Sequence, residues 1–175
     1  MRSDAADEVI TDRTKIVAVT HVGNTTGAIT DIAPIIRRTH EVGAVFVLDA
    51  CQSVPHLKVD FHALDVDFAA WSAHKMYGPT GVGFLYGKRE MLEALPPANF
   101  GGSMVELAWM DQEAQYMEPP ARFEAGTQPV AQVVAAGVAA EWLMNIGMEN
   151  LEAHERTITD ELLKMGDIDG IRTVS

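Results

Sequence analysis

The sequence predicts an α/β fold with three layers and a largely parallel sheet. Three short apolar segments, residues 15–21, 44–49 and 67–72, have the length and side-chain types of buried strands. A segment with helical character, residues 31–42, separates the first two, and such alternation indicates parallel strands joined by a crossover helix. The chain has 175 residues, of which 47% are hydrophobic, which is enough for one hydrophobic core.

The remaining elements of the first half follow from boundary signals. Residues 1–14 are polar and predict a frayed or helical lead-in. The helix over 31–42 has Pro34 near its start and Gly43 just past its end, where these residue types favour helix boundaries. Residues 61–65 predict a short helical turn, 83–86 a fourth strand, and 88–95 a short helix.

The second half is less regular. Residues 96–128 show neither a helix nor a strand pattern, and a segment of that length is usually functional or contains an unrecognised element. Residues 129–146 predict a long apolar helix, with Pro129 in its first turn and Gly147 at its end. Residues 149–165 predict a second helix, and 170–174 predict the start of a strand.

Composition excludes several classes of function. The net charge of −12 disfavours nucleic acids and anionic membranes as partners. No apolar run free of charge reaches the length of about 18 residues that a membrane span needs, and the polar, acidic start does not resemble a signal peptide. Cys51 is the single cysteine, so no intramolecular disulfide is expected, and the six histidines show no metal-binding spacing. These observations predict a cytoplasmic protein without a metal site.

Polar residues follow each of the three predicted parallel strands, at positions 21–24, 49–52 and 72–75. Ligands of open α/β sheets bind at the carboxyl ends of the strands. The three clusters therefore predict one site at that edge of the sheet.

Lys75 is the candidate reactive group of this site. It follows a short strand and precedes a turn rich in Gly and Pro, which would deliver it into a polar concave site. Partial burial favours the neutral, nucleophilic amine that Schiff-base chemistry needs, and Ser72 and His74 beside it could donate hydrogen bonds to a phosphate. The alternative is a surface hairpin with a solvated lysine.

The segment Ser72-Ala-His-Lys75-Met-Tyr-Gly-Pro-Thr-Gly81 resembles the lysine motif of fold-type I pyridoxal-phosphate (PLP) enzymes of the class V aminotransferase group. Within that group it is most similar to the cysteine desulfurases of the SufS type. The resemblance extends from about residue 15 to about residue 156. It implies that Lys75 forms the Schiff base with pyridoxal 5'-phosphate, and that Ser72 and His74 bind the phosphate.

Further cofactor contacts are implied by Asp49-Ala-Cys-Gln52, which resembles the family's Asp-x-x-Gln segment. Asp49 would pair with the pyridine nitrogen, and Gln52 with the ring hydroxyl. From residues alone, Asp49 could equally be a helix N-cap or a solvated loop residue. Asn24 matches a family residue that reaches the ring hydroxyl and the substrate region, although Gly23 replaces the usual serine before it.

Two other residues have competing interpretations. Thr127, within Phe123-Glu-Ala-Gly-Thr127, resembles a residue that reaches the cofactor phosphate of the neighbouring subunit, which implies a homodimer with shared sites. Capping of the helix that follows Pro129 is an equal alternative. Cys51 is expected to be a small buried thiol and not a sulfur acceptor, because free cysteines are usually buried and unreactive.

The implied reaction converts L-cysteine to L-alanine and passes sulfur as a persulfide to an acceptor protein for iron–sulfur cluster assembly. Family members are more than twice as long as this chain, so the resemblance implies a central fragment, with 1–150 in the PLP-binding large domain and 151–175 entering the small domain. The matched region lacks the family's cofactor-stacking histidine, substrate-binding arginine and persulfide cysteine. We therefore expect little activity from the isolated chain. The alternatives are another class V aminotransferase or lyase, and a non-enzymatic domain acting by association.

Overall fold

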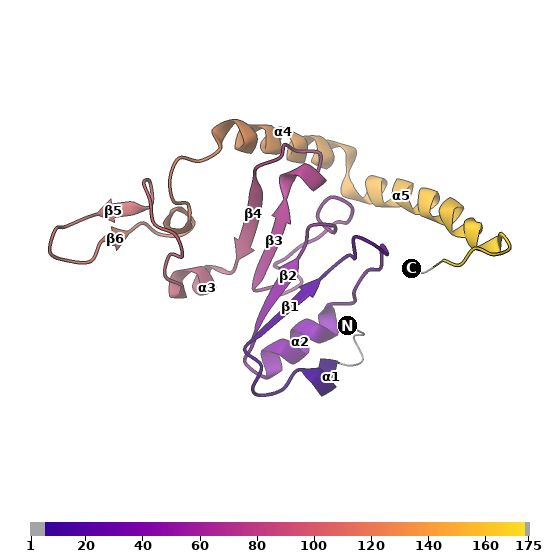
Figure 1. Ribbon diagram of the computed structural model, residues 1–175, viewed down its shortest axis with the longest axis horizontal. Helices are drawn as coiled ribbons and strands as arrows, with labels where there is room; N and C mark the ends of the chain where they lie inside the picture. Colours follow the sequence, from indigo (N-terminus) through magenta and orange to yellow (C-terminus); the bar gives the residue numbers. More distant parts are fainter. Residues whose placement is uncertain (1–5, 174–175) are drawn as a thin grey trace.

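The centre of the molecule is a four-stranded sheet (Figure 1). The computed structural model describes residues 6–173, and the sheet has the order β1-β2-β3-β4. The strands are β1 Ile16–Thr20, β2 Val45–Asp49, β3 Phe68–Ser72 and β4 Gly83–Gly87. β1, β2 and β3 are parallel, and β4 pairs with β3 in the antiparallel direction. The α/β class and the mostly parallel sheet are confirmed.

The helices lie where the sequence predicts them, with small shifts at their ends. They are α1 Ala6–Val9, α2 Ala33–Glu41, α3 Arg89–Ala94, α4 Val130–Ile146 and α5 Met148–Leu163. Short 3₁₀ segments, η2 Ala73–Lys75, η3 Ala121–Phe123 and η4 Lys164–Asp167, complete the set. Part of the predicted lead-in is therefore helical, as α1, while residues 1–5 lie outside the described range.

Two local expectations are confirmed in outline and one is wrong. The segment 96–128 contains an element that the sequence pattern did not show, a small hairpin of β5 Val105–Leu107 and β6 Gln115–Tyr116, which projects away from the main sheet (Figure 1). Residues 61–65 form a hydrogen-bonded turn, in which the Leu64 N–H donates to the Asp60 carbonyl at 3.0 Å. The strand expected over 170–174 is absent from its described part, because residues 171–173 have no ladder partner, and Val174 lies outside the described range.

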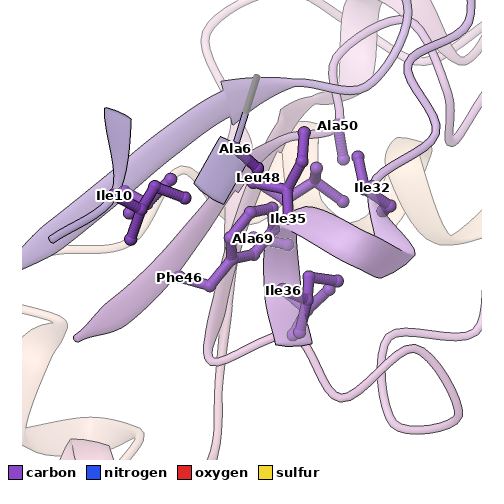
Figure 2. Packing of buried hydrophobic residues seen from close by; sticks show 11 residues of the cluster. Ala6, Ile10, Ile32, Ile35, Ile36, Phe46, Leu48, Ala50 and Ala69 are labelled. Carbon is purple, nitrogen blue, oxygen red and sulfur yellow. The ribbon is translucent and has the colours of Figure 1, made fainter. Parts of the chain in front are cut away.

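The main hydrophobic core lies between one face of the sheet and helices α1 and α2 (Figure 2). Paired residues of neighbouring strands point to the same face, and the register places Leu48 beside Ala69. Phe46 and Leu48 are fully buried there, against Ile35 and other residues of α2. This core is what fixes the position of strand β2, which ends at Asp49.

The opposite face of the sheet is open. Ile16 and Leu85 on this face are 66% and 61% exposed. Of the three predicted layers, residues 6–173 therefore supply the sheet and the helical layer on one side only. This agrees with the prediction that the domain is incomplete. The side chains of Thr20, Asp49 and Ala70 form a row on the same open face, because the register pairs each with the next.

A buried charged cluster anchors the amino-terminal end of β3. Asp67, only 1% exposed, accepts hydrogen bonds from the Phe46 N–H at 2.8 Å and from Lys88 Nζ at 2.7 Å, and it lies 2.9 Å from His40 Nε2. Burial alone would raise the pKa of Asp67, but the bonds from Lys88, Phe46 and His40 lower it overall. The carboxylate is therefore held in its charged form.

Helices α4 and α5 lie outside this core. α4 crosses the ends of β3 and β4 (Figure 1) and buries Ala136, Ala139 and Leu143. It ends at Gly147, whose φ of 86° suits a residue without a side chain. α5 contains no buried residue. The division at residue 150 stays a prediction, and Gly147 is the nearby break between the two helices.

One ion pair and one side-chain hydrogen bond connect α5 with the turn after β2. Lys58 Nζ lies 2.6 Å from Glu149 Oε1, and His56 Nδ1 lies 2.8 Å from Glu155 Oε1. These contacts hold α5 beside the loops at the carboxyl edge of the sheet.

Within residues 6–173, no single helix has the length and apolar character to cross a membrane. The pair Val130–Ile146 and Met148–Asp167 meets that test only together, across a 77° bend.

Candidate functional site

The carboxyl ends of β1, β2 and β3 meet at one edge of the sheet, because the three strands are parallel. Asp49 is the last residue of β2, Ser72 is the last residue of β3, and Lys75 ends the 3₁₀ turn that follows. The predicted convergence of polar groups at this edge is therefore present in the fold.

The Asp49 carboxylate has one partner on each oxygen. Oδ1 accepts the backbone N–H of Cys51 at 3.0 Å, and the Thr20 hydroxyl lies 3.5 Å from Oδ2. The first contact is an Asx-type turn, in which the carboxylate bonds the N–H two residues ahead. Asp49 is otherwise exposed on the open face, so its oxygens remain accessible to a ligand. Asp49 therefore has a local role, because it stabilises the turn that follows β2. Its exposure agrees with the alternative of a solvated loop residue.

Cys51 connects Asp49 with the residues that follow β3. Its Sγ lies 4.0 Å from the carbonyl oxygen of Ala70. Burial raises the pKa of the Cys51 thiol, and a hydrogen bond to Asp49 and its negative charge raise it further. A hydrogen bond from Ser72 and the charge of Lys75 act in the opposite direction. Asp49, Ser72 and Lys75 are therefore all near enough to Cys51 to influence its thiol.

A protonated thiol is a poor nucleophile. The expectation that Cys51 is buried is only partly correct, because its exposure is intermediate, and the direction of its pKa shift is compatible with an unreactive thiol.

The turn after Lys75 is as tight as its composition predicts. Gly78 N–H donates to the Ala73 carbonyl at 2.9 Å, and a Cβ on Gly78 would lie 2.9 Å from the same oxygen. Tyr77 has a φ of 62°, which is uncommon for a bulky residue. Such backbone strain is concentrated at functional sites in proteins. Lys75 therefore lies on the connection of the antiparallel β3–β4 hairpin, as the alternative interpretation expected, but it is partly buried and its turn is constrained.

A second part of the site comes from the loop after β1. This loop is closed by the bridge between Val22 and Ile29 and by the Thr30 N–H bond to the His21 carbonyl at 2.8 Å. It brings Asn24 to Gln52, whose amide Nε2 donates to Asn24 Oδ1. The resemblance implied that each of them reaches the cofactor's ring hydroxyl, and this contact is compatible with that implied role.

Asn24 and Gln52 line a cavity of about 410 Å³, which also involves α5. Its far wall includes Glu155 and Arg156 of that helix. The cavity is thus bounded by the strand-end loops on one side and by α5 on the other.

His21, which directly follows β1, is buried, and the structure gives its side chain no evident role in the candidate site. It is 9% exposed, its Nδ1 has no hydrogen-bond partner among residues 6–173, and burial lowers its pKa. A lowered pKa keeps the imidazole neutral, which is the favourable form for an unpaired ring nitrogen in an apolar setting. The interpretation as a strand-end histidine is consistent with this position.

The structure does not bring together all of the sequence-predicted residues. His74 is exposed in the middle of η2. Thr127 is exposed before α4, and within the described range no hydrogen bond links it to Asp49, Ser72 or Lys75. The capping alternative for Thr127 is not seen either, since Pro129 is the N-cap of α4 and no side chain caps that helix.

The groups gathered at the strand ends match the chemistry of PLP. They comprise the amine of Lys75, the carboxylate of Asp49 and the hydroxyl of Ser72, with the Asn24–Gln52 amide pair nearby and the His74 imidazole exposed in the same turn as Lys75. A carboxylate suits a pyridinium nitrogen, an amine suits the aldehyde, and hydroxyl and imidazole donors suit a phosphate. The residues fit the cofactor. By contrast, no three His, Cys, Asp or Glu side chains between residues 6 and 173 are grouped as metal ligands would be.

Sequence reasoning missed one member of the cluster, Thr20. No sequence pattern marks Thr20 as a site residue, because its pairing with Asp49 depends on the register between β1 and β2. Strand register is not visible in the order of residues when both strands are short and apolar.

Comparisons with known proteins point to one family. The family model described as aminotransferase class-V matches residues 1–175. A probable cysteine desulfurase 2 of Mycobacterium leprae is 49% identical over 164 residues, which cover 93% of this chain and 39% of that protein.

Solved structures agree. The crystal structure of the Escherichia coli cysteine desulfurase CsdA is 38% identical with a TM-score of 0.88, over 94% of this chain and 41% of that one. A C-DES variant with glycine covalently linked to its PLP cofactor has a TM-score of 0.77 at 24% identity, over 86% of this chain and 41% of that one, which supports the fold alone. The chain thus spans about 40% of the length of these relatives.

Proposed function

Because the chain belongs to the class V aminotransferase family, we propose that its strand-end cluster is part of the PLP site of a SufS-type cysteine desulfurase. The observation that carries this proposal is the topology of the sheet. Strands β2 and β3 are parallel and end at the same edge, with Asp49 and Ser72 as their last residues and Lys75 in the turn that follows.

Each residue has a role that suits its chemistry. When bound, PLP supplies an electron-accepting ring that stabilises negative charge on the substrate carbon. Asp49 holds the proton on the ring nitrogen, because a carboxylate favours a neighbouring cation. The Lys75 amine holds the cofactor covalently and, when released as a neutral amine, accepts and returns the substrate proton.

The remaining contacts orient the cofactor. Ser72 and His74 donate hydrogen bonds to its phosphate, and Gln52 with Asn24 reaches its ring hydroxyl. The bond between Gln52 and Asn24 supports this shared role, because it already orients the two amides toward each other. Thr127 serves the neighbouring subunit's phosphate, so that the complete enzyme is a homodimer.

The complete enzyme would act on L-cysteine, release L-alanine, and pass the sulfur as a persulfide to an acceptor protein for iron–sulfur cluster assembly. The relatives named cysteine desulfurases support this substrate. Cys51 does not take the sulfur, since its raised pKa disfavours the thiolate. A cytoplasmic location remains the prediction from composition.

The chain by itself should have little desulfurase activity, because one face of its sheet is open beside Asp49. Water at the open face would weaken every electrostatic contact of the site. Incubation of the purified chain with PLP and cysteine, followed by measurement of alanine and sulfide, tests this. Robust turnover would show that the open face is no obstacle.

Covalent trapping tests the cofactor site directly. The protein is incubated with PLP, reduced with borohydride, digested, and examined by mass spectrometry for the modified lysine. We expect modification at Lys75 and its loss in Lys75→Ala. Lys58→Ala is the matched control, because Lys58 is exposed and pairs only with Glu149. Modification spread evenly over the exposed lysines would contradict the proposal, as would an unchanged pattern in Lys75→Ala.

Full-length protein distinguishes desulfurase from another class V aminotransferase or lyase. We expect alanine as the product from cysteine, at a rate well above that for other amino acids. Transfer of an amino group to a keto acid, or release of pyruvate from cysteine, would favour the other classes instead.

A further inference from the structure

Thr20 is the one polar side chain of the cluster to which the proposed function gives no role. It is the last residue of β1 and lies directly opposite Asp49 in the parallel register. Residues paired across neighbouring strands project from the same face of a sheet. The Thr20 hydroxyl and the Asp49 carboxylate therefore share the open face, and the Thr20 Oγ1 to Asp49 Oδ2 distance is 3.5 Å.

The backbone around Thr20 is fixed by three hydrogen bonds. The Thr20 carbonyl accepts the Thr30 hydroxyl at 2.9 Å, the His21 N–H donates to the Asp49 carbonyl at 3.0 Å, and the Thr30 N–H donates to the His21 carbonyl at 2.8 Å. Of these, the His21 N–H bond to the Asp49 carbonyl ties the end of β1 to β2, whereas the two Thr30 bonds close the loop that follows β1. The hydroxyl is therefore held close to Oδ2, and a β-branched side chain has few rotamers available to it.

The carboxylate of Asp49 is held from both sides by different kinds of donor. The Cys51 N–H binds Oδ1 from the same turn, at 3.0 Å. This single bond leaves the carboxylate free to rotate about its Cβ–Cγ bond, because that torsion is soft. A second donor on Oδ2 restricts the rotation and fixes the plane of the carboxylate.

We propose that Thr20 is a positioning residue, which orients the Asp49 carboxylate toward the ring nitrogen of PLP. This inference rests on the proposed function, because it assumes that Asp49 meets that nitrogen. In this proposal Thr20 acts through Asp49, the side chain that its hydroxyl approaches. A fixed carboxylate plane directs an oxygen lone pair at the nitrogen without an ordering cost at the moment of binding.

The test uses Thr20→Val, Thr20→Ser and the control Thr30→Val in the full-length protein. Valine keeps the β-branched shape and removes the donor, whereas serine restores the hydroxyl. Thr30→Val removes a hydroxyl from the same loop that bonds a carbonyl and not Asp49. Binding of PLP alone is measured by titration, and the protonation of its ring nitrogen by the ¹⁵N chemical shift of ring-labelled PLP.

We expect Thr20→Val to weaken PLP binding about three- to tenfold, the range for one hydrogen bond to a partly exposed carboxylate, and to shift the ¹⁵N signal toward the unprotonated value. Thr20→Ser should recover most of both effects, and Thr30→Val should show neither. In an Asp49→Asn background the added effect of Thr20→Val should vanish, because the two residues act as a unit.

Three outcomes would overturn the inference. An unchanged ¹⁵N signal and affinity in Thr20→Val, with normal PLP binding by the wild type, would contradict this inference alone. Equal effects of Thr30→Val and Thr20→Val would mean that loop integrity, and not the hydroxyl, is what matters. Failure of the wild type to bind PLP would contradict the proposed function as well. If Thr20→Val does not fold, Thr20→Ala against Thr20→Ser makes the same comparison.

Discussion

The two halves of the molecule are held together by different forces. Residues 6–95 contain the main core and the strand-end cluster, and their fully buried side chains include Phe46 and Leu48. In residues 96–173 the long helices are only lightly packed. α5 buries no residue, and α4 leaves Val134 and Val138 more than 60% exposed at 63% and 62%.

This difference shows that an apolar composition does not by itself give a buried helix. α4 is apolar on all sides, and a helix of that kind is normally buried on all sides. The first half therefore supports its own geometry, whereas the second half has the composition of buried structure without the matching contacts. Equivalent mutations in the two halves should therefore differ clearly in how much they lower the free energy of unfolding.

Truncation of the core should have the largest effect. We expect Phe46→Ala to lower the free energy of unfolding by about 3–5 kcal/mol, because a large buried side chain leaves a cavity. Val138→Ala in the second half should change it by less than about 0.5 kcal/mol, since Val138 is 62% exposed. Urea unfolding of both variants measures this. A loss of similar size for Val138→Ala would mean that this face of α4 is buried in solution.

The charged cluster at β3 should come next. We expect Asp67→Asn to lower the free energy of unfolding by roughly 3 kcal/mol, because it leaves the buried donors of Lys88 and Phe46 poorly paired. Glu149→Gln in the second half, at an exposed pair with Lys58, should give no resolvable change. Urea unfolding at neutral pH compares the two. Equal losses of unfolding free energy in Asp67→Asn and Glu149→Gln would mean that the buried cluster stabilises the fold no more than the exposed pair does.

Acid should act through the same cluster. The pKa of Asp67 and that of Asp65 are lowered in the folded state, Asp65 mainly by the Lys88 hydrogen bond. A lowered folded pKa contributes stability that is fully present above the unfolded carboxyl pKa of about 4 and is lost as the pH falls through the folded value. We expect the free energy of unfolding to fall below about pH 4. The slope should be shallower in Asp67→Asn, and an identical slope would contradict the assignment.

Alkylation of Cys51 probes the site within the first half. Because it is the single cysteine, its reaction with iodoacetamide can be followed without ambiguity. We expect it to react several times more slowly than a free thiol at neutral pH, since its pKa is raised by burial and by Asp49. Asp49→Asn should speed the reaction and Lys75→Ala should slow it, because Lys75 lowers the pKa. Opposite signs would place these residues apart from the thiol.

The smallest effect concerns the pairs that join the halves. We expect Glu155→Gln to speed amide exchange in α5, because that helix has no buried side chain and depends on Glu155 and Glu149 for its contacts. Added salt should have a similar effect on the wild type. Glu161→Gln is the control, since Glu161 pairs only with Lys164 of the next turn. Equal protection in both variants would show that apolar contacts hold α5.

The sequence predicted the parts that depend on local composition. The strands ending at Asp49 and Ser72 and the helices α2, α4 and α5 were expected within a few residues of their observed bounds. Parallel connection then placed the polar strand ends at one edge, because that follows from topology alone. The tight turn at Gly78 also follows from its residues.

The parts it did not predict depend on long-range pairing. The hairpin β5–β6 has strands of three and two residues, too short for alternation to be recognised. The expected strand at the carboxyl end failed because a strand needs a partner, and residues 171–173 have none. The buried cluster joins residues separated by 21 and 27 positions, Lys88 and His40 with Asp67.

Family resemblance, and not pattern, supplied the individual roles in the candidate site. No pattern in the sequence predicts which groups contact Asp49. Thr20 was overlooked because its contact with Asp49 depends on the register between β1 and β2. Thr127 is the opposite of Thr20: the resemblance gives it a role, but that role concerns a neighbouring subunit and not a contact within this chain.

The close approach of Gly78 to Ala73 has a consequence for mutational scanning. With 2.9 Å between a hypothetical Cβ and the Ala73 oxygen, every one of the other nineteen residue types would have to displace backbone. A saturation library selected for growth would therefore show position 78 as nearly intolerant, alongside Lys75, for which we propose the reactive role, three codons earlier. Such a map would give the two positions the same score, although one of them carries no reactive atom at all.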